Sequence, residues 1–596
     1  MLQYGYGGRI LRINLTNREY SIEELKKSWI KNVIGGRAAN SKRLLEELNP
    51  DCDPLGPENI LIFGVGPLTG SILPASAYFT VSTKSPFTGI LGDSAAGGHF
   101  GAEMKLTGFD QIIITGQADK LIYLLVTESG VEFKDCPHLA GKTILDTTSL
   151  IRKENRNHSI QVAAIGLAGE NKVLFSSIIS SGNRANARTG MGAVMGSKNV
   201  KALAVKGSQS VQVADPLALI DEAAIMSKKI LAHEEYQKRY RMGTTMLMKD
   251  MDGIGILPTR HFQEGVCDYV DEISGERLAD TFKVKNKACF NCNVHCSRYY
   301  ITDKVEAEGP EYETLCGFTS RIGNSKIDFA LEMNWFLNQV GMDSLSACEM
   351  IGWIMECQEK GLIKPEDVDG IELKWGDTDK VRDLMKLIVN REGIGDKLAD
   401  GVTKFSKQFS EEAQKLVMQV KGLELICGDP RGIKAYGLTY AIASRGGDHL
   451  RAEPYFELTQ KWDIAKERFG TEKAADRLAE EGKAALVTYS EKIALLTDCL
   501  TMCKNIGLCM DVLRPEDASR ILKAATGINY PPEYLLKIMG EAVDRDYQLN
   551  KKFGLKKEDD TLPDRFVKEP LTKGPTKGSV VDIERMVSEY NELHKR

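Results

Sequence analysis

The first two hundred residues carry short runs of apolar, mostly β-branched side chains. Glycine, proline and asparagine separate these runs, as turns between strands require. The pattern predicts a β-rich N-terminal domain over residues 1–208. The runs expected to form strands are 8–15, 59–66, 78–85, 111–116, 120–127 and 202–207.

From about residue 210 the apolar positions recur with the spacing of amphipathic helices. A helix is predicted to start after Asp215, because this side chain can cap it and Pro216 suits the first helical position. We expect two mostly helical domains, 209–415 and 416–596, and therefore an α+β protein of three domains. Further helices are expected at 328–340, 346–361, 380–391, 491–505 and 517–527.

Composition excludes several classes of protein. The net charge of −5 leaves no basic footprint, so no nucleic-acid partner is expected. No run of 18 apolar residues and no N-terminal signal segment are found, so we expect no membrane span and no export. Thirteen irregularly spaced cysteines in 596 residues favour a reducing, cytoplasmic location over a disulfide framework.

Three of these cysteines form a C-x2-C-x3-C run: Cys289, Cys292 and Cys296. Soft thiolate ligands select zinc or iron–sulfur clusters, and a tetrahedral set needs a fourth donor from elsewhere. Cys509 is our candidate for that donor. A cluster shared by these four thiols would join the second and third domains, at an interface of the kind that often holds cofactors. A structural zinc knuckle, or three unrelated buried thiols, are the alternatives.

An ordered series of longer motifs extends over most of the chain. It includes G-P-L-T-G at 66–70, T-K-S-P at 83–86, G-G-H-F-G-A-E at 97–103, G-x-G-A-V-M-G-S-K-N-x-K-A at 190–202, E-G-P-E-Y-E at 308–313, D-P-R-G at 429–432 and L-P-x-R-F at 562–566. In these runs the chain resembles the tungsten-containing aldehyde:ferredoxin oxidoreductases. The resemblance implies two molybdopterin-type cofactors that chelate one tungsten or molybdenum, beside one [4Fe–4S] cluster. It also implies a β-rich domain under the pterins, two helical domains above them, and the four cysteines as cluster ligands.

The resemblance also implies pterin contacts in two motifs of the form D-x-x-G-L-D/C. Here these read N-Q-V-G-M-D (Asn338, Gly341, Asp343) and K-N-I-G-L-C (Lys504, Gly507, Leu508, Cys509). The leading aspartate is lost in both motifs. Asn338 can still accept a hydrogen bond, whereas Lys504 can only donate one.

Phosphate contacts, with a magnesium ion bridging the pterin phosphates, are implied in the N-terminal domain. Tyr78 replaces an arginine of the family and Ala95 replaces an asparagine. The contacts are therefore expected from other groups, including a backbone nest that needs glycine rather than a particular side chain. The candidates are Lys84, Ser94, Ala95, Gly97, Gly98, Arg184, Ala185 and Arg188.

Three residues are expected to be catalytic by the same resemblance. Glu313 falls on the acid/base position of E-G-P-E-Y-E, where burial beside an anionic centre would raise its pKa. The alternative for this run is an acidic, solvated loop. His449 is expected to orient the substrate or a metal ligand, and Tyr436 to contact substrate oxygen. Asp448 stands where the family has cysteine, and we expect it to alter the substrate pocket.

The resemblance implies oxidation of aldehydes to carboxylic acids, with electrons passing through the cluster to ferredoxin or a ferredoxin-like subunit. Glu332 remains from a family E-x-x-H pair that holds a bridging iron, but Trp335 replaces the histidine. We expect any homo- or hetero-oligomer to form without that iron. Two alternatives stay open: a reductive relative of the carboxylic acid or benzoyl-CoA reductase type, and an electron-transfer subunit without tungstopterin.

Overall fold

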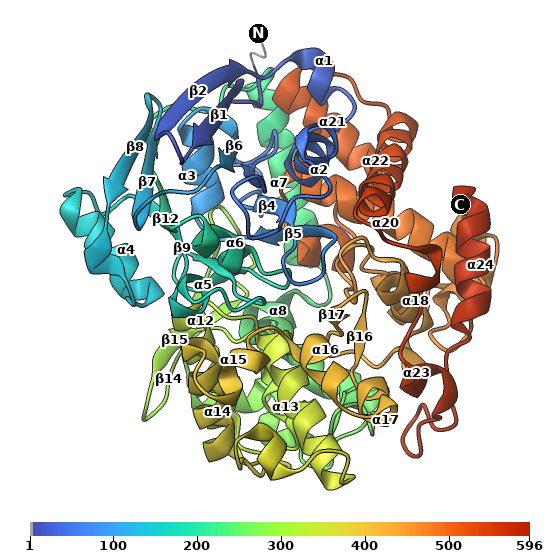
Figure 1. Ribbon diagram of the computed structural model, residues 1–596. Coiled ribbons are helices and arrows are strands. Elements are labelled where there is room, and N and C mark those ends of the chain that lie inside the picture. Colours follow the sequence, from blue (N-terminus) through green and yellow to red (C-terminus); the bar gives the residue numbers. More distant parts are fainter. Residues whose placement is uncertain (1–3) are drawn as a thin grey trace.

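A computed structural model describes residues 4–596 (Figure 1). Two six-stranded sheets fill the N-terminal part, in the strand orders β2-β1-β6-β3-β4-β5 and β11-β10-β9-β12-β7-β8. Faces of both sheets meet in one core with α3 and α6, which includes Phe63, Phe79 and Leu124. Each of the six predicted runs overlaps a strand, namely β1, β3, β4, β6, β7 and β12.

The strands of the two large sheets have the following bounds: β1 Arg9–Asn14, β2 Glu19–Glu24, β3 Leu61–Gly64, β4 Phe79–Lys84, β5 Leu91–Ala96, β6 Phe109–Thr115, β7 Ile122–Thr127, β8 Gly130–Asp135, β9 Gln161–Ala164, β10 Ile178–Ser180, β11 Arg184–Asn186 and β12 Val200–Val205. The smaller sheets contain β13 Lys283–Lys287, β14 Ser297–Ile301 and β15 Glu306–Glu308, and the pair β16 Gln419–Val420 and β17 Leu423–Glu424.

Helices dominate after residue 215, and the first begins as predicted: the Asp215 Oδ1 accepts a hydrogen bond from the Ala218 N–H at 3.0 Å. The helices used below are α2 Gly36–Glu47, α3 Phe100–Leu106, α6 Met191–Ser197, α7 Pro216–Ala232, α12 Ile327–Val340, α13 Ser344–Glu359, α14 Thr378–Asn390, α18 Lys434–Ile442, α20 Lys483–Leu500, α21 Pro515–Thr526, α22 Pro532–Lys552 and α24 Ile583–His594. None of the helices in the described residues combines the length and apolar character that a membrane crossing needs.

One predicted helix is shorter than expected. The run 491–505 was predicted to be helical throughout, but α20 ends at Leu500, where Thr501 takes a left-handed φ of 57°. The Cys503 N–H then donates to the Ala75 carbonyl at 3.1 Å. This contact with the N-terminal part draws the chain away from the helix axis, and Asn505–Cys509 form a π-helical turn.

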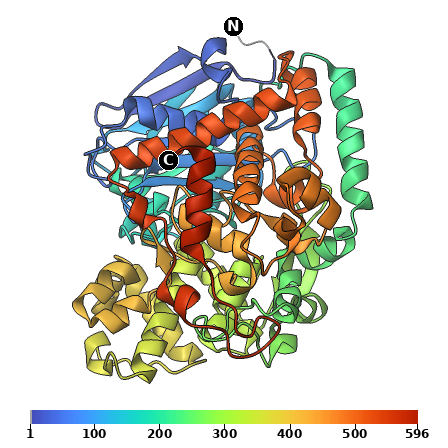
Figure 2. The same cartoon turned by 90° about the vertical axis from the view of Figure 1, so that its right-hand side faces the viewer.

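The N-terminal and C-terminal parts share a core. Helix α2 packs against α20 and α22, and Val33, Ile34 and Ala38 are buried with Leu495 and Leu500. In Figure 2 the orange and red C-terminal helices lie directly over the blue N-terminal strands. A site built between these parts is therefore held by packed elements rather than by loops alone.

Candidate active site

A cavity of about 420 Å³ lies where the N-terminal strands, the loop of residues 289–296 and the C-terminal segments meet. Most of the site residues predicted from sequence line this cavity: Ala95, Gly97, Arg184, Ala185, Cys289, Cys292, Cys296, Glu313, Asn338, Asp343, Tyr436, His449, Lys504 and Cys509. The others do not line it: Ser94, Gly98, Arg188, Gly341, Gly507 and Leu508. Segments far apart in sequence are thus brought to one place.

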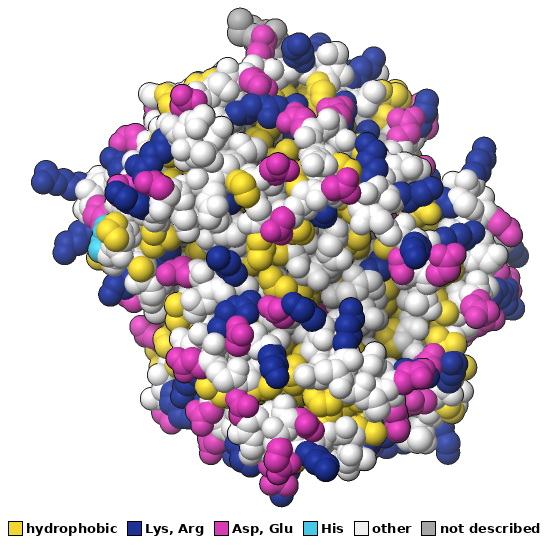
Figure 3. All heavy atoms as spheres, viewed as in Figure 1, with side chains coloured by type: hydrophobic (Ala, Val, Ile, Leu, Met, Phe, Trp, Pro, Cys, Tyr) yellow, Lys and Arg dark blue, Asp and Glu magenta, His cyan; other side chains and the backbone are white. Residues whose placement is uncertain are grey.

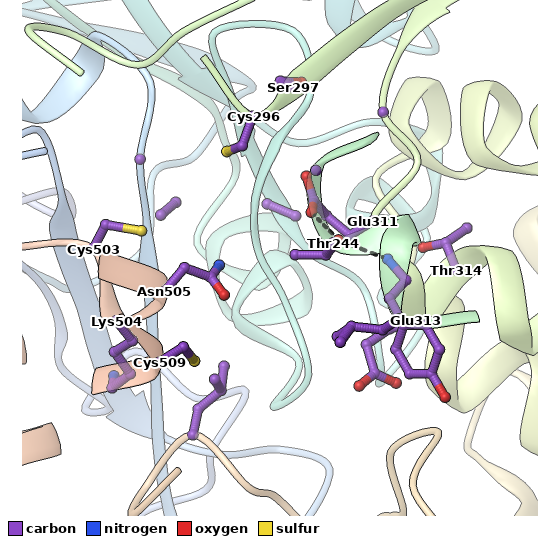
Figure 4. A pocket seen from close by; sticks show the side chains of 18 of the residues that line it. Thr244, Cys296, Ser297, Glu311, Glu313, Thr314, Cys503, Lys504, Asn505 and Cys509 are labelled. Carbon is purple, nitrogen blue, oxygen red and sulfur yellow. Dashed lines mark hydrogen bonds between the residues drawn. The ribbon is translucent and has the colours of Figure 1, made fainter. Parts of the chain in front are cut away.

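The thiols of the predicted cluster ligands lie on one side of the cavity, and Glu313 lies on the other. Figure 4 shows the thiols of Cys296, Cys503 and Cys509 on one side, and the carboxylates of Glu311 and Glu313 on the other. The Cys509 Sγ lies 3.8 Å from the Glu453 Oε1, and the Cys503 Sγ lies 3.4 Å from the Tyr78 hydroxyl. Cys503 was not selected from sequence because it lies outside the glycine motif. Its neighbour Tyr78 places Cys503 beside the loop of residues 289–296.

The side chains gathered at the 289–296 loop are thiols, which are the donors that iron–sulfur clusters take. Burial raises the pKa of Cys292 to about 12, and the charge of Cys503 adds to this shift. Gathered thiols of this kind become thiolates when a cationic metal group neutralises them. A Cβ at Gly97 would lie 2.8 Å from the Cys289 Sγ, so only glycine allows the backbone to approach that thiol so closely.

The E-G-P-E-Y-E segment is not uniformly solvated. Glu306 and Glu311 are exposed, whereas Glu308 is ion-paired with Arg184. Glu313, in contrast, is enclosed by protein and open only toward the cavity, and its Oε2 accepts a hydrogen bond from the Cys427 N–H at 2.7 Å. Burial raises the pKa of Glu313, although the nearby His449 opposes the shift. The pKa of Glu313 therefore lies above that of a solvated glutamate.

Glu453 connects the other two predicted catalytic residues. The Tyr436 hydroxyl donates to the Glu453 Oε1 at 3.0 Å, and the His449 Nε2 lies 3.4 Å from the Glu453 Oε2. The Tyr436 and His449 rings stack with centroids 6.1 Å apart. The His449 Nδ1 is buried and has no hydrogen-bond partner within the described part of the chain. Sequence reasoning missed Glu453 because it belongs to no motif; its role is visible only from its contacts.

The two pterin-motif regions hold residues that already have protein partners. Gly341 ends α12 with a φ of 70°, and Asp343 caps α13 by accepting a hydrogen bond from the Ser346 N–H at 3.0 Å. Lys504 is ion-paired with Asp498, and burial lowers the pKa of Lys504 to about 8. Asn338 donates to the Asn334 carbonyl at 2.9 Å, which leaves its own carbonyl oxygen to accept.

The expected phosphate-binding groups are also engaged. Lys84 donates to the carbonyls of Pro50 and Cys52, away from the cavity, and Arg188 donates to the carbonyls of Glu424 and Gly447. The Gly98 carbonyl accepts from the Phe290 N–H at 2.9 Å. Gly98 and Arg184 thus support the loop of residues 289–296, which carries the predicted cluster cysteines.

The substituted residue Asp448 and the retained residue Glu332 both take structural positions. Asp448 does not line the cavity as we expected: it is buried against Arg445, with 2.6 Å between Oδ2 and Nη2. Burial is the opposing influence, yet the Arg445 charge keeps the pKa of Asp448 far below its usual range. Glu332 accepts hydrogen bonds from Arg382 at 2.7 and 2.9 Å.

Comparison with known families agrees with this architecture. Residues 10–207 match the model of the aldehyde ferredoxin oxidoreductase N-terminal domain, and residues 222–595 match that of domains 2 and 3. The chain belongs to the aldehyde ferredoxin oxidoreductase family. The resemblance seen in the sequence, the α+β fold and the oxidoreductase class are therefore confirmed.

Proteins to which this chain is similar carry names that point to different substrates. The chain is 36% identical to the tungsten-containing aldehyde ferredoxin oxidoreductase of Pyrococcus furiosus, over 99% of this chain and 96% of that protein. It is 29% identical to an aliphatic sulfonate oxidoreductase, WOR-like subunit, of the same organism, over 99% of this chain and 94% of that protein. The active site complex BamBC of benzoyl coenzyme A reductase shares the fold, with a TM-score of 0.86 and 24% identity over 99% of this chain and 94% of that one.

Proposed function

We propose that this protein oxidises aldehydes to carboxylic acids: R–CHO and water give R–COOH, two protons and two electrons. The proposed cofactors are a tungsten or molybdenum bis-molybdopterin and a [4Fe–4S] cluster. Electrons would leave for ferredoxin or a ferredoxin-like subunit. The 36% identity to a tungsten aldehyde oxidoreductase over nearly the whole chain supports this reaction class.

The chemistry divides between the two sides of the cavity. When bound, the metal–pterin group accepts the two electrons of the oxidation and the cluster passes them on singly. Cys289, Cys292, Cys296 and Cys509 would hold the cluster on the thiol side. Asn338, Asp343 and Lys504 line the same cavity and would meet the pterins. Electrons and protons therefore leave the substrate in different directions.

Glu313 is the proposed acid/base group. Its carboxylate would take a proton from the attacking water as the new carbon–oxygen bond forms, and release it as the acid product leaves. The Cys427 N–H holds one oxygen of this carboxylate at 2.7 Å and leaves the other for water. The raised pKa of Glu313 brings its proton affinity closer to that needed at neutral pH.

Tyr436 and His449 would orient the substrate. The carboxylate of Glu453 fixes the Tyr436 hydroxyl, and it lies beside the His449 Nε2, which leaves the His449 Nδ1 free to bind an oxygen atom. A carbonyl held there would face the carboxylate of Glu313 across one cavity. Such placement lowers the entropy cost of the reaction.

The observation that carries the proposal is a buried carboxylate of raised pKa facing the thiol side of one cavity. The test is anaerobic purification, metal analysis and an aldehyde screen with a viologen dye, run in both directions. About one tungsten or molybdenum and about four irons per chain, with aldehyde-dependent dye reduction, would support it. Reduction of acids or thioesters without aldehyde oxidation would favour the reductive alternative, and iron without pterin would favour an electron-transfer subunit.

A further inference from the structure

A basic strand edge lies next to the proposed cluster loop. Strand β13 carries Lys283, Lys285 and Lys287 and is an edge strand, bonded only to β14 in its sheet. Lys285 and Lys287 are exposed and Lys283 is half-buried. None of the three is ion-paired within the part of the chain that the structure describes. The protein has a net charge of −5, so three lysines without an ion pair make this a locally positive surface.

Aromatic rings hold these lysines at the surface. The Nζ atoms of Lys285 and Lys287 lie 5.4 and 6.0 Å from the centroid of the Tyr299 ring, and the Nζ of Lys283 lies 5.8 Å from that of Tyr240. A cation over a ring face stays charged and well placed. The lysines therefore form an ordered surface rather than three independent side chains.

Nearby carboxylates are mostly neutralised. Asp280 is ion-paired with Arg241 at 2.6 Å, and Glu308 is ion-paired with Arg184. Among the described residues near this face, Glu306 and Glu311 have no ion pair; the Glu306 carboxylate binds the Tyr299 hydroxyl, and the Glu311 carboxylate binds the Thr244 hydroxyl. The charge that this face presents to a partner is thus positive.

The strand leads directly into the loop that holds the thiols. Lys287 is two residues before Cys289, and Lys287 also borders the cavity. Cys289, Cys292 and Cys296 are half-buried, while Asn291 and His295 between them are exposed. The His295 ring lies 6.3 Å from that of Tyr240, so loop and strand form one continuous face. Only the 289–296 loop would then separate a protein bound on this face from the proposed cluster.

We infer that β13 and the 289–296 loop form the docking surface for an acidic iron–sulfur protein that takes the electrons. The inference rests on the proposed function, because only a redox enzyme of this kind needs such a partner. Exposed lysines act mainly by steering encounter, and small, transient interfaces are typical of electron-transfer pairs. A partner with carboxylates around its own redox centre complements this surface.

The test compares two electron acceptors on the loaded enzyme. Aldehyde-dependent reduction of an acidic bacterial ferredoxin and of methyl viologen is measured at low and at physiological ionic strength. For Lys285→Glu/Lys287→Glu, we expect kcat/KM for ferredoxin to fall by about tenfold or more at low salt and to lose its salt dependence. The viologen rate is compared in the single variant Lys285→Glu, which leaves the cavity-lining Lys287 in place; it should stay within about twofold of wild type, because this small dye does not need a docked protein surface.

A matched control changes the same charge elsewhere. Lys26→Glu/Lys27→Glu alters two exposed lysines at the start of α1 (Lys27–Ile30), which Figure 1 shows at the opposite end of the molecule from β14. This control should keep wild-type ferredoxin kinetics, and Lys285→Gln/Lys287→Gln should lie between wild type and the reversal. Wild-type ferredoxin kinetics in the charge reversal would overturn the docking surface. A wild-type enzyme inactive with viologen as well would instead count against the proposed reaction.

Discussion

At the residue scale, Glu313 is the side chain whose ionisation should control turnover. It must be deprotonated to take a proton, and its folded pKa is raised above the ordinary value of about 4.3. Activity should therefore rise with pH through that raised pKa and be lost below it. Glu313→Gln should lower kcat by about 10²- to 10⁴-fold and remove this limb from the pH–rate profile.

The neighbouring Glu311 provides a control in the same cavity. Its carboxylate accepts a hydrogen bond from the Thr244 hydroxyl and stands closer to the thiol side. Glu311→Gln should keep the low-pH limb and most of the activity. An unchanged pH profile in Glu313→Gln, with tungsten and iron retained, would remove Glu313 from the acid/base role.

The identity of the fourth cluster ligand can be tested by replacing the sulfur of one cysteine with oxygen. The glycine motif selects Cys509, but the structure places Cys503 beside Tyr78 and the loop of Cys289. Cys509→Ser should lower iron from about four to about three per chain or fewer, because serine is a poor ligand for iron–sulfur clusters. Cys503→Ser should keep four. The opposite pattern in iron analysis and reduced-cluster spectra would give the ligand position to Cys503.

These residues mark the limit of what the sequence could predict about the site. Glu313, His449 and Tyr436 were found through their motifs, and the structure brings all three to one cavity. Glu453 and Cys503 carry no spacing signal, because their neighbours come from contacts with distant residues. Arg184 was selected for its charge, yet the structure pairs it with Glu308 at the cluster loop.

At the element scale, a buried ionic network joins α13 to α23 (Asp564–Lys568). Arg565 binds Glu356 at 2.5 Å, and the His261 Nδ1–H donates to the same carboxylate at 2.7 Å. Burial opposes ionisation, but His261 and Arg565 together lower the pKa of Glu356 to about 2. The L-P-x-R-F run therefore contributes a clamp between the helical parts.

Breaking this clamp should destabilise the protein. Glu356→Ala leaves Arg565 without its buried partner, which costs about 3–5 kcal/mol, and calorimetry should show a lower melting temperature. The folded pKa of Glu356 is depressed, so its contribution is full above the unfolded value of about 4.3 and is lost as pH falls toward 2. The variant should lack this acid dependence. Glu359→Ala, at an exposed position on α13, should melt like wild type.

The same scale shows why most elements, but not all, could be predicted. Strand runs and amphipathic helices carry their own periodicity, so β1, β7, α12 and α14 appear where expected. The end of α20 does not, because Thr501 adopts positive φ without being glycine. Contacts with Ala75, over four hundred residues earlier, decide that end. The residues next to Thr501 in the sequence do not indicate these contacts.

At the scale of the whole molecule, a cofactor in the cavity would contact parts of the chain that are otherwise held together only by packing. The cavity walls come from β5, the 289–296 loop, α12 and the segment after α20. Protein made without tungsten, molybdenum and iron should therefore melt at a lower temperature, because cofactors bind only the folded state. Limited proteolysis should cut this apo-protein faster than the loaded enzyme near residues 501–510. Equal cutting rates and melting temperatures would show that the cofactors do not stabilise the segments that line the cavity.

The separation of the cysteines along the chain has a consequence for synthesis on the ribosome. Cys509 follows Cys296 by 213 residues, which take roughly 10 to 40 s to translate at about 5–20 residues per second. During that interval the nascent polypeptide contains three of the four proposed cluster cysteines and lacks Cys509. An iron–sulfur cluster delivered early would meet an incomplete set, so the assembly machinery must act after the last domain has left the exit tunnel.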